Sequence, residues 1–160
     1  MECPFCKIAK KEIESVILYE DNFFISVLDI FPNIPGQIIV FPKRHVKYLW
    51  ELEDSEIARI FTFIKIISKS LKEELNVDGI SIYIPQDTIA GQRFDHLIIY
   101  VFPRKKDDKF YINWERKQIE IKELEEIKNR ISKRIKNILE KGKEENINFI
   151  EMYRWYIKKP

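Results

Sequence analysis

Histidine, cysteine and glycine are all scarce in this chain of 160 residues. It contains two histidines, His45 and His96, two cysteines, Cys3 and Cys6, and four glycines. Any chemistry that needs an imidazole or a thiol therefore depends on those four side chains. There is no internal repeat and no long Gly/Ser linker. Because 45% of the residues are hydrophobic, which is enough for one core, we expect a single domain overall.

Long apolar runs are also missing. No segment approaches the ~20 consecutive apolar residues that a membrane-spanning helix needs, and the N-terminus does not resemble a signal peptide. We therefore expect a cytoplasmic protein with no membrane partner. Alanine and glutamine are rare while isoleucine, lysine and glutamate are abundant. This bias is typical of thermophilic, for instance archaeal, proteins, although AT-rich coding would produce the same composition.

The net charge is small, at +2, but it is unevenly distributed. Acidic residues are in excess before residue 104 and basic residues after it. A basic C-terminal third can contact a nucleic acid. However, its charges alternate in sign, which is typical of a solvated helix face. A nucleic acid is therefore the less favoured partner.

The apolar pattern predicts five strands and two main helices, which is an α+β composition. The strands are expected at residues 16–19, 23–28, 38–41, 81–84 and 96–102. One helix is expected from an N-cap at Asp54 to about Leu75, and a second from about Leu124 to near Gly142. Because the strand at 96–102 is apolar on both faces, we expect it to be central in the sheet.

The C-terminal end is unusually rich in apolar side chains. Between residues 147 and 157 these are Phe149, Met152, Tyr153, Trp155, Tyr156 and Ile157. A terminus this apolar is expected to be tied down. We expect residues 1–104 to form the core and residues 105–160 to add a helix and an aromatic tail that pack on the same domain. Filling of a pocket and docking on a second subunit are the alternatives for the tail.

The N-terminal Cys3-Pro4-Phe5-Cys6 has the spacing of a zinc knuckle, in which two thiolates contribute to a set of four ligands. A redox pair and a structural disulfide are the other interpretations. A redox CxxC normally follows a strand, and no strand can precede Cys3. A disulfide would suit an intracellular protein of a hyperthermophile. We favour zinc.

Residues 90–104, AGQRFDHLIIYVFPR, resemble the signature strand of the histidine-triad (HIT) superfamily, in which AGQ leads into His-x-His-x-His and the strand ends with Pro-Arg. Residues 28–37, with Leu-Asp-Ile at the start and Pro-Gly-Gln at the end, resemble a characteristic turn of the family. Residues 38–45 resemble its strand ending in Pro-Lys-x-His. Several fragments in the family's order make the resemblance specific. It implies a HIT-like fold with an antiparallel sheet, and a homodimer.

The resemblance also implies a complete metal site. In zinc-bearing relatives, the histidine of the Pro-Lys-x-His strand and the first histidine of the signature strand complete the ligand set. Those positions are His45 and His96 in this chain. One structural zinc per chain, held by Cys3, Cys6, His45 and His96, is therefore expected.

The catalytic positions depart from the family. The position of the nucleophilic histidine holds Ile98, and the other two histidine positions hold Tyr100 and Gln37. Asp29 and Gln92 match residues that contact the ribose and the phosphate in relatives. Nearby, Pro85 lacks a backbone donor and Asp87 would repel a phosphate.

The resemblance therefore implies a degenerate member of the superfamily. We expect a zinc-stabilised binding or scaffold protein without nucleotide hydrolase or transferase activity, with a purine nucleotide as a weak candidate ligand. The alternative is a divergent nucleotide hydrolase or nucleotidyltransferase. Isoleucine cannot act as a nucleophile, and a tyrosine with its usual high pKa is a poor one at neutral pH.

Overall fold

A computed structural model describes residues 3–111 and 117–144. These residues fall into two compact units, residues 1–111 and 112–160, and the second contains the helix α3 (Ile121–Glu144). The predicted packing of residues 105–160 on the core stays a prediction, and the aromatic tail at 147–157 lies outside the described residues. None of the described helices is long and apolar enough to cross a membrane.

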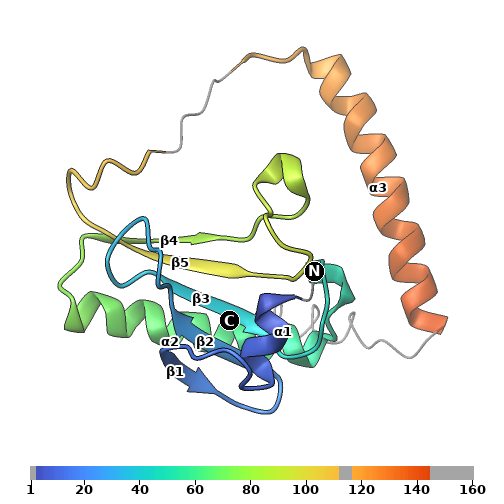
Figure 1. Cartoon of the computed structure of the whole chain (residues 1–160). Coiled ribbons are helices and arrows are strands. Elements are labelled where there is room, and N and C mark those ends of the chain that lie inside the picture. Colours follow the sequence, from blue (N-terminus) through green and yellow to red (C-terminus); the bar gives the residue numbers. More distant parts are fainter. Residues whose placement is uncertain (1–2, 112–116, 145–160) are drawn as a thin grey trace, which may run out of the picture. The chain divides into compact units, whose positions relative to one another are not determined.

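The first unit is built on a five-stranded antiparallel sheet with the strand order β1-β2-β3-β5-β4 (Figure 1). The α+β fold and the predicted number of strands are confirmed. The strands are β1 (Ile17–Glu20), β2 (Phe24–Leu28), β3 (Ile38–Pro42), β4 (Gly79–Tyr83) and β5 (Ile99–Arg104).

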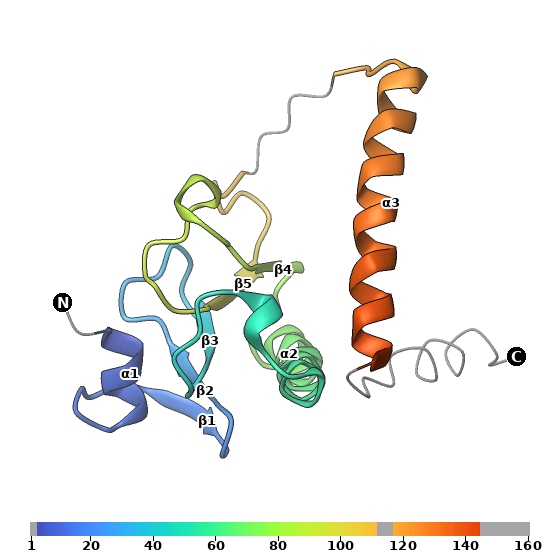
Figure 2. The same cartoon turned by 90° about the vertical axis from the view of Figure 1, so that its right-hand side faces the viewer.

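Each face of the sheet is covered by one helix, as Figure 2 shows. The long helix α2 (Asp54–Glu74) packs Ile60, Ile64 and Ile67 on the face that carries Ile99 and Val101. The short helix α1 (Pro4–Ala9) packs Phe5 on the opposite face, which carries Ile98 and Phe41. Because side chains alternate along a strand, residues 97–101 contribute to both cores, as predicted for a central strand.

The start of α2 differs from the prediction. The N-cap is Glu53 rather than Asp54, and its backbone N–H donates to the Glu56 carboxylate at 2.8 Å. Glu56 thus satisfies a donor at the helix end, where the first N–H groups have no partner within the helix. A short 3₁₀ turn (Leu49–Glu51) precedes the helix.

The signature strand also begins later than predicted, at Ile99 instead of His96. The β3–β5 ladder ends with the pair Val40 and Ile99. Farther along, Pro42 has no N–H to donate, and the backbone N–H of Leu97 donates to the carbonyl of Val46 at 2.7 Å instead. His96 is consequently held by a loop next to the sheet.

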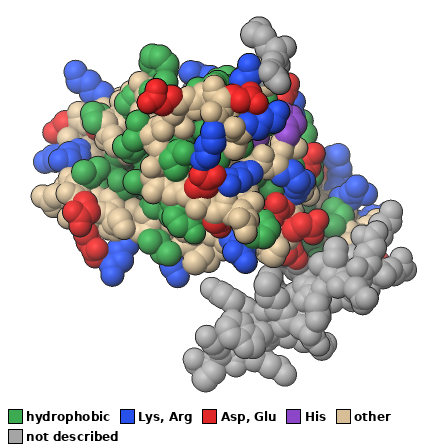
Figure 3. Space-filling view, turned by 60° about the horizontal axis from the view of Figure 1, so that its bottom comes forward, with side chains coloured by type: hydrophobic (Ala, Val, Ile, Leu, Met, Phe, Trp, Pro, Cys, Tyr) green, Lys and Arg blue, Asp and Glu red, His purple; other side chains and the backbone are tan. Residues whose placement is uncertain are grey.

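The surface is mixed in character. In the face shown in Figure 3, hydrophobic side chains are interspersed with lysine, arginine and acidic residues. This arrangement is typical of a solvated surface.

Candidate metal centre and adjoining cleft

Both cysteines and both histidines of the chain converge at one end of α1. The donor atoms of Cys3, Cys6, His45 and His96 all lie within 4.8 Å of one another. Cys3 is the N-cap of α1 and Cys6 lies one turn later, so the two thiols share one side of the helix. Among the described residues no disulfide joins them. The cluster can therefore hold a metal ion.

The imidazole of His96 is oriented for metal binding. Its Nε2 lies 2.8 Å from the carbonyl oxygen of Pro42. A carbonyl oxygen only accepts hydrogen bonds, so Nε2 carries the proton and Nδ1 presents a lone pair. That Nδ1 lies 3.3 Å from the sulfur of Cys3 and 3.7 Å from the sulfur of Cys6. The side chain is fully buried, and burial lowers the pKa of His96, which favours the neutral form that binds metals.

His45 completes the cluster from the loop that follows β3. Its Nδ1 lies 3.2 Å from the sulfur of Cys6. The ring of Phe5, between the two cysteines in the sequence, packs against His96 with centroids 5.6 Å apart. The cluster is thus solvated at His45 and enclosed by aromatic side chains at His96, which suits a structural ion held by four ligands.

A cleft of ≈ 390 Å³ lies beside α1, on the face of the sheet that α1 covers. Its walls come from α1, β2, β3, β5 and the loops around residues 30 and 93. The polar or charged side chains that line it include Asp29, Arg93 and Tyr100. The apolar lining includes Phe5, Ile8, Ile30, Phe31 and Phe94. Such a mixture of apolar walls with a few polar groups is typical of a small-molecule site.

Asp29 belongs to a hydrogen-bonded turn at the mouth of this cleft. One carboxylate oxygen accepts from the backbone N–H of Phe31 at 2.9 Å, and the other accepts from Nε2 of Gln37 at 2.5 Å. The Gln37 side chain oxygen accepts in turn from the backbone N–H of Asn33 at 2.9 Å. Gln37 is buried and does not line the cleft. In this position it stabilises the turn that presents Asp29.

The Gln92 side chain likewise forms hydrogen bonds within the protein. Its oxygen accepts from the backbone N–H of Asp87 at 2.8 Å, while its Nε2 donates to the carbonyl oxygens of Lys47 at 3.0 Å and His96 at 3.4 Å. It follows Gly91, whose positive φ of 86° turns the chain. The side chain is buried and lies outside the lining of the cleft. Its hydrogen bonds hold the loop that carries His96.

Ile98, which directly precedes β5, and Tyr100, within β5, have different surroundings although they are two residues apart. Ile98 is only 2% exposed and packs with Phe5, Ile25 and Phe41. Tyr100 is partly buried and lines the cleft. Burial and then the charge of Asp29 raise the pKa of Tyr100. Its phenol therefore stays protonated at neutral pH and can donate a hydrogen bond.

Several cleft residues were not singled out by sequence reasoning. Arg93 follows the AGQ turn directly, and Phe94 comes next. Ile30 and Phe31 follow Asp29. The only signal for Arg93 is its position next to a recognised motif, and the two apolar residues after Asp29 are unremarkable in a chain this rich in isoleucine and phenylalanine.

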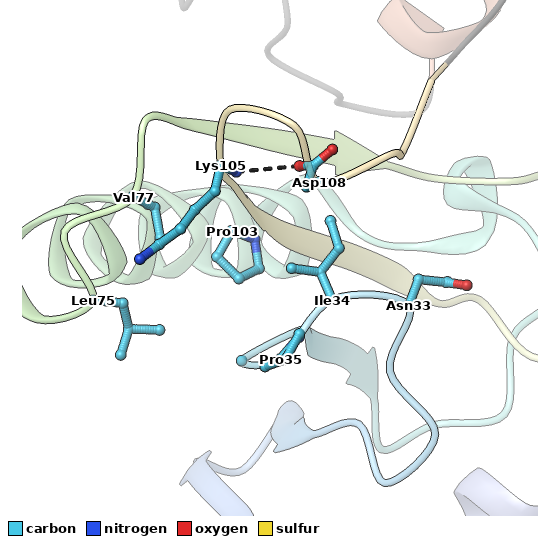
Figure 4. Close-up of a pocket in the computed structure, with 9 residues that line it drawn as sticks. Asn33, Ile34, Pro35, Leu75, Val77, Pro103, Lys105 and Asp108 are labelled. Carbon is cyan, nitrogen blue, oxygen red and sulfur yellow. Dashed lines mark hydrogen bonds between the residues drawn. The ribbon is translucent and has the colours of Figure 1, made fainter.

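A second cavity, of ≈ 550 Å³, lies away from the metal cluster, near the end of α2 (Figure 4). Its walls are mainly apolar, from Ile34, Leu75 and Pro103. Its carboxylate, Asp108, is paired with Arg104 and accepts the backbone N–H of Lys105 at 3.1 Å. The cavity therefore offers little polar recognition compared with the cleft beside α1.

Comparison with known proteins agrees with this geometry. A HIT domain model matches residues 10–107. An adenosine 5′-monophosphoramidase of Schizosaccharomyces pombe is 30% identical over 137 residues, covering 85% of this chain and 100% of that protein. A solved structure from Streptococcus mutans superposes with a TM-score of 0.79 at 30% identity, covering 84% of this chain and 85% of the other. A zinc-bound histidine triad family protein of Mycobacterium smegmatis gives a TM-score of 0.64 at 30% identity, covering 73% and 85%. The chain therefore belongs to the histidine-triad (HIT) family.

Proposed function

We propose that this protein is a zinc-stabilised HIT protein that binds a purine nucleotide without cleaving it and acts as a binding or scaffold protein. One observation carries the proposal. The position of the family nucleophile, Ile98, is part of the hydrophobic core, while the cleft beside it remains open and retains Asp29. The open cleft supports the binding part of the proposal, and the buried Ile98 supports the absence of covalent catalysis.

Zinc is the metal that best fits the donor set. Two cysteine sulfurs and two imidazole nitrogens form a closed set of four, which is typical of structural zinc. The Mycobacterium smegmatis relative is itself zinc-bound. The ion would join α1 to the loops that carry His45 and His96, so its binding energy would contribute to folding.

The chemistry of the cleft supports a nucleotide as the ligand. The apolar walls suit a planar base. The carboxylate of Asp29 suits the two hydroxyls of a ribose, since it can accept two hydrogen bonds. The Schizosaccharomyces pombe relative is named for an adenosine substrate, which is why we choose adenosine compounds as probes.

The alternative function is a divergent nucleotide hydrolase or nucleotidyltransferase. The openness of the cleft and the position of Tyr100 in its wall favour this alternative. Against it, the raised pKa of Tyr100 leaves its phenol a weak nucleophile.

The quaternary and cellular context follows the family resemblance. We propose a cytoplasmic homodimer. The strand β4 is an outer strand of the sheet, and its residues Ile82 and Tyr83 are exposed. A second copy can extend the sheet there, because an outer strand presents unpaired backbone groups.

The proposed function is tested on the purified full-length chain. Metal analysis is expected to give one zinc per chain, and titration calorimetry is expected to detect AMP binding that Asp29→Asn weakens. Adenosine 5′-phosphoramidate is expected to remain intact when followed by chromatography. Turnover well above a zinc-only blank, reduced by Tyr100→Phe, would establish the enzyme instead. Absence of zinc, or absence of AMP binding, would refute the corresponding part of the proposal.

A further inference from the structure

Three positions that the family resemblance assigns to nucleotide chemistry offer no polar group to the cleft. Ile98 is apolar, and Gln37 and Gln92 are buried and engaged in internal hydrogen bonds. The side chain of Asp87 brings a negative charge to the loop, where it accepts a hydrogen bond from the hydroxyl of Tyr48 at 2.7 Å. A nucleotide phosphate would therefore need a different partner.

Arg93 is the cation that lines this cleft. It lies in the loop between the AGQ turn and His96, is exposed, and shares the cleft with Tyr100 and Asp29. Burial and then the charge of Asp29 raise the pKa of Tyr100, and the positive charge of Arg93 lowers it by less. A guanidinium and a phenolic hydroxyl are thus both available on the same wall as hydrogen-bond donors.

Two lysines on the loop that follows β3 are engaged in ion pairs. Lys47 forms an ion pair with Asp95 at 2.9 Å, and Lys43 forms one with Glu20 at 2.7 Å. Arg93 takes part in none of the ion pairs found among residues 3–111 and 117–144. Two carboxylates, Glu14 and Asp29, also line the cleft, so a phosphate is favoured only at the Arg93 end.

We propose that Arg93 anchors the phosphate of a nucleoside 5′-monophosphate, with the Tyr100 hydroxyl as a second donor. The inference rests on the proposed nucleotide-binding function and specifies its ligand class. A guanidinium matches phosphate oxygens with two parallel hydrogen bonds. It stays protonated and offers no lone pair, so it binds the phosphate without attacking it. Recognition of phosphate is thereby retained in a chain that has lost the histidine nucleophile.

Paired titrations of the zinc-loaded full chain with AMP and with adenosine test this assignment. AMP is expected to bind on the order of 10-fold more tightly than adenosine, the effect of one charge-assisted contact. Arg93→Ala is expected to remove most of the preference for AMP over adenosine, with the Tyr100 hydroxyl still present, and to leave adenosine affinity unchanged. Arg93→Lys, which keeps the charge but loses the paired geometry, is expected to be intermediate. Lys69→Ala removes an exposed charge on α2 and serves as the matched control.

The outcomes separate this proposal from the one it rests on. If adenosine and AMP bind equally and Arg93→Ala changes neither, the cleft binds nucleosides and the role of Arg93 is refuted. If neither compound binds, the nucleotide-binding function fails and the anchor fails with it. If Lys69→Ala weakens AMP binding as much as Arg93→Ala does, the effect is general electrostatics and the specific contact is refuted. Unchanged melting temperatures of the variants show that folding is preserved.

Discussion

Ile98, Gln37 and Gln92 each stand at a position that the family resemblance assigns to nucleotide chemistry, and each is buried. Ile98 fills the space between α1 and the sheet. Gln37 holds the turn at Asp29, and Gln92 ties the loop at Asp87 to the backbone of Lys47. Their burial makes their contribution to stability measurable, because truncating a buried side chain leaves a cavity.

Ile98→Ala is expected to lower the free energy of unfolding by about 2–5 kcal/mol, and Ile98→Val by about 0.5–1.5 kcal/mol, because the site is enclosed by aromatic and aliphatic neighbours. Denaturant unfolding followed by circular dichroism measures both. Ile66→Ala, at an exposed position on α2, is the matched control and is expected to cost less. Equal losses for Ile98→Ala and Ile66→Ala would show that Ile98 has no special packing role.

Residue roles could be predicted only where the pattern is local or the residue type is rare. Cys3 and Cys6 stand out by their spacing, and the family resemblance pointed to His45 and His96, which the fold brings beside them. The internal role of Gln92 could not be predicted, since its hydrogen-bond partner Lys47 lies 45 residues away in the sequence. Arg93 was missed because a single arginine beside a motif carries no pattern of its own. Contacts of this kind depend on the folded chain.

At the level of elements, α2 begins with a network that joins the helix to the loop after β3. Glu56 accepts the backbone N–H of Glu53 and a guanidinium N–H of Arg44, each at 2.8 Å. Burial raises the pKa of Glu56, but these hydrogen bonds outweigh that effect and leave its pKa below the usual value. The sequence predicted the helix from its apolar spacing. It could not identify the cap, because Asp54 is the preferred N-cap residue type and the hydrogen bond that marks Glu53 forms only in the folded helix.

The lowered pKa of Glu56 predicts a pH dependence of stability. A carboxylate with a depressed folded-state pKa contributes stability above its unfolded pKa of ~4.3, and that contribution is lost as the pH falls through the folded value. Glu56→Gln is therefore expected to flatten the acid side of the stability profile, measured by melting temperature between about pH 3 and pH 6.

The change in the free energy of unfolding is expected to be at most about 1 kcal/mol, since Arg44 is 49% exposed and water screens the pair. Glu73→Gln, in the exposed pair with Lys69, is expected to leave the profile unchanged. A parallel flattening in both variants would contradict a specific role for Glu56.

For the whole molecule, the arrangement of a sheet between two unequal helices determines where ligands can bind. The long helix α2 covers one face with the core around Ile60, Ile64 and Val101. The short helix α1 covers only part of the other face, and the cleft lies along its edge. This difference was not evident from the sequence, because the packing of Phe5 on residues of β2 and β3 joins segments that are far apart in the chain.

The helix α1 supplies one wall of the cleft through Pro4, Phe5 and Ile8, and the same helix carries two of the four metal-binding side chains. If both sites are occupied as proposed, we expect their occupancies to be thermodynamically coupled through α1, and coupling of this kind is reciprocal. Removing the metal with a chelator is expected to weaken AMP binding, and saturating AMP is expected to tighten zinc binding by the same factor. Competition with a zinc-chelating dye, with and without AMP, measures the second effect. Equal zinc affinities in the two titrations would mean that α1 keeps its place without the ion. A reciprocal gain would make the nucleotide affinity of this protein a readout of zinc availability.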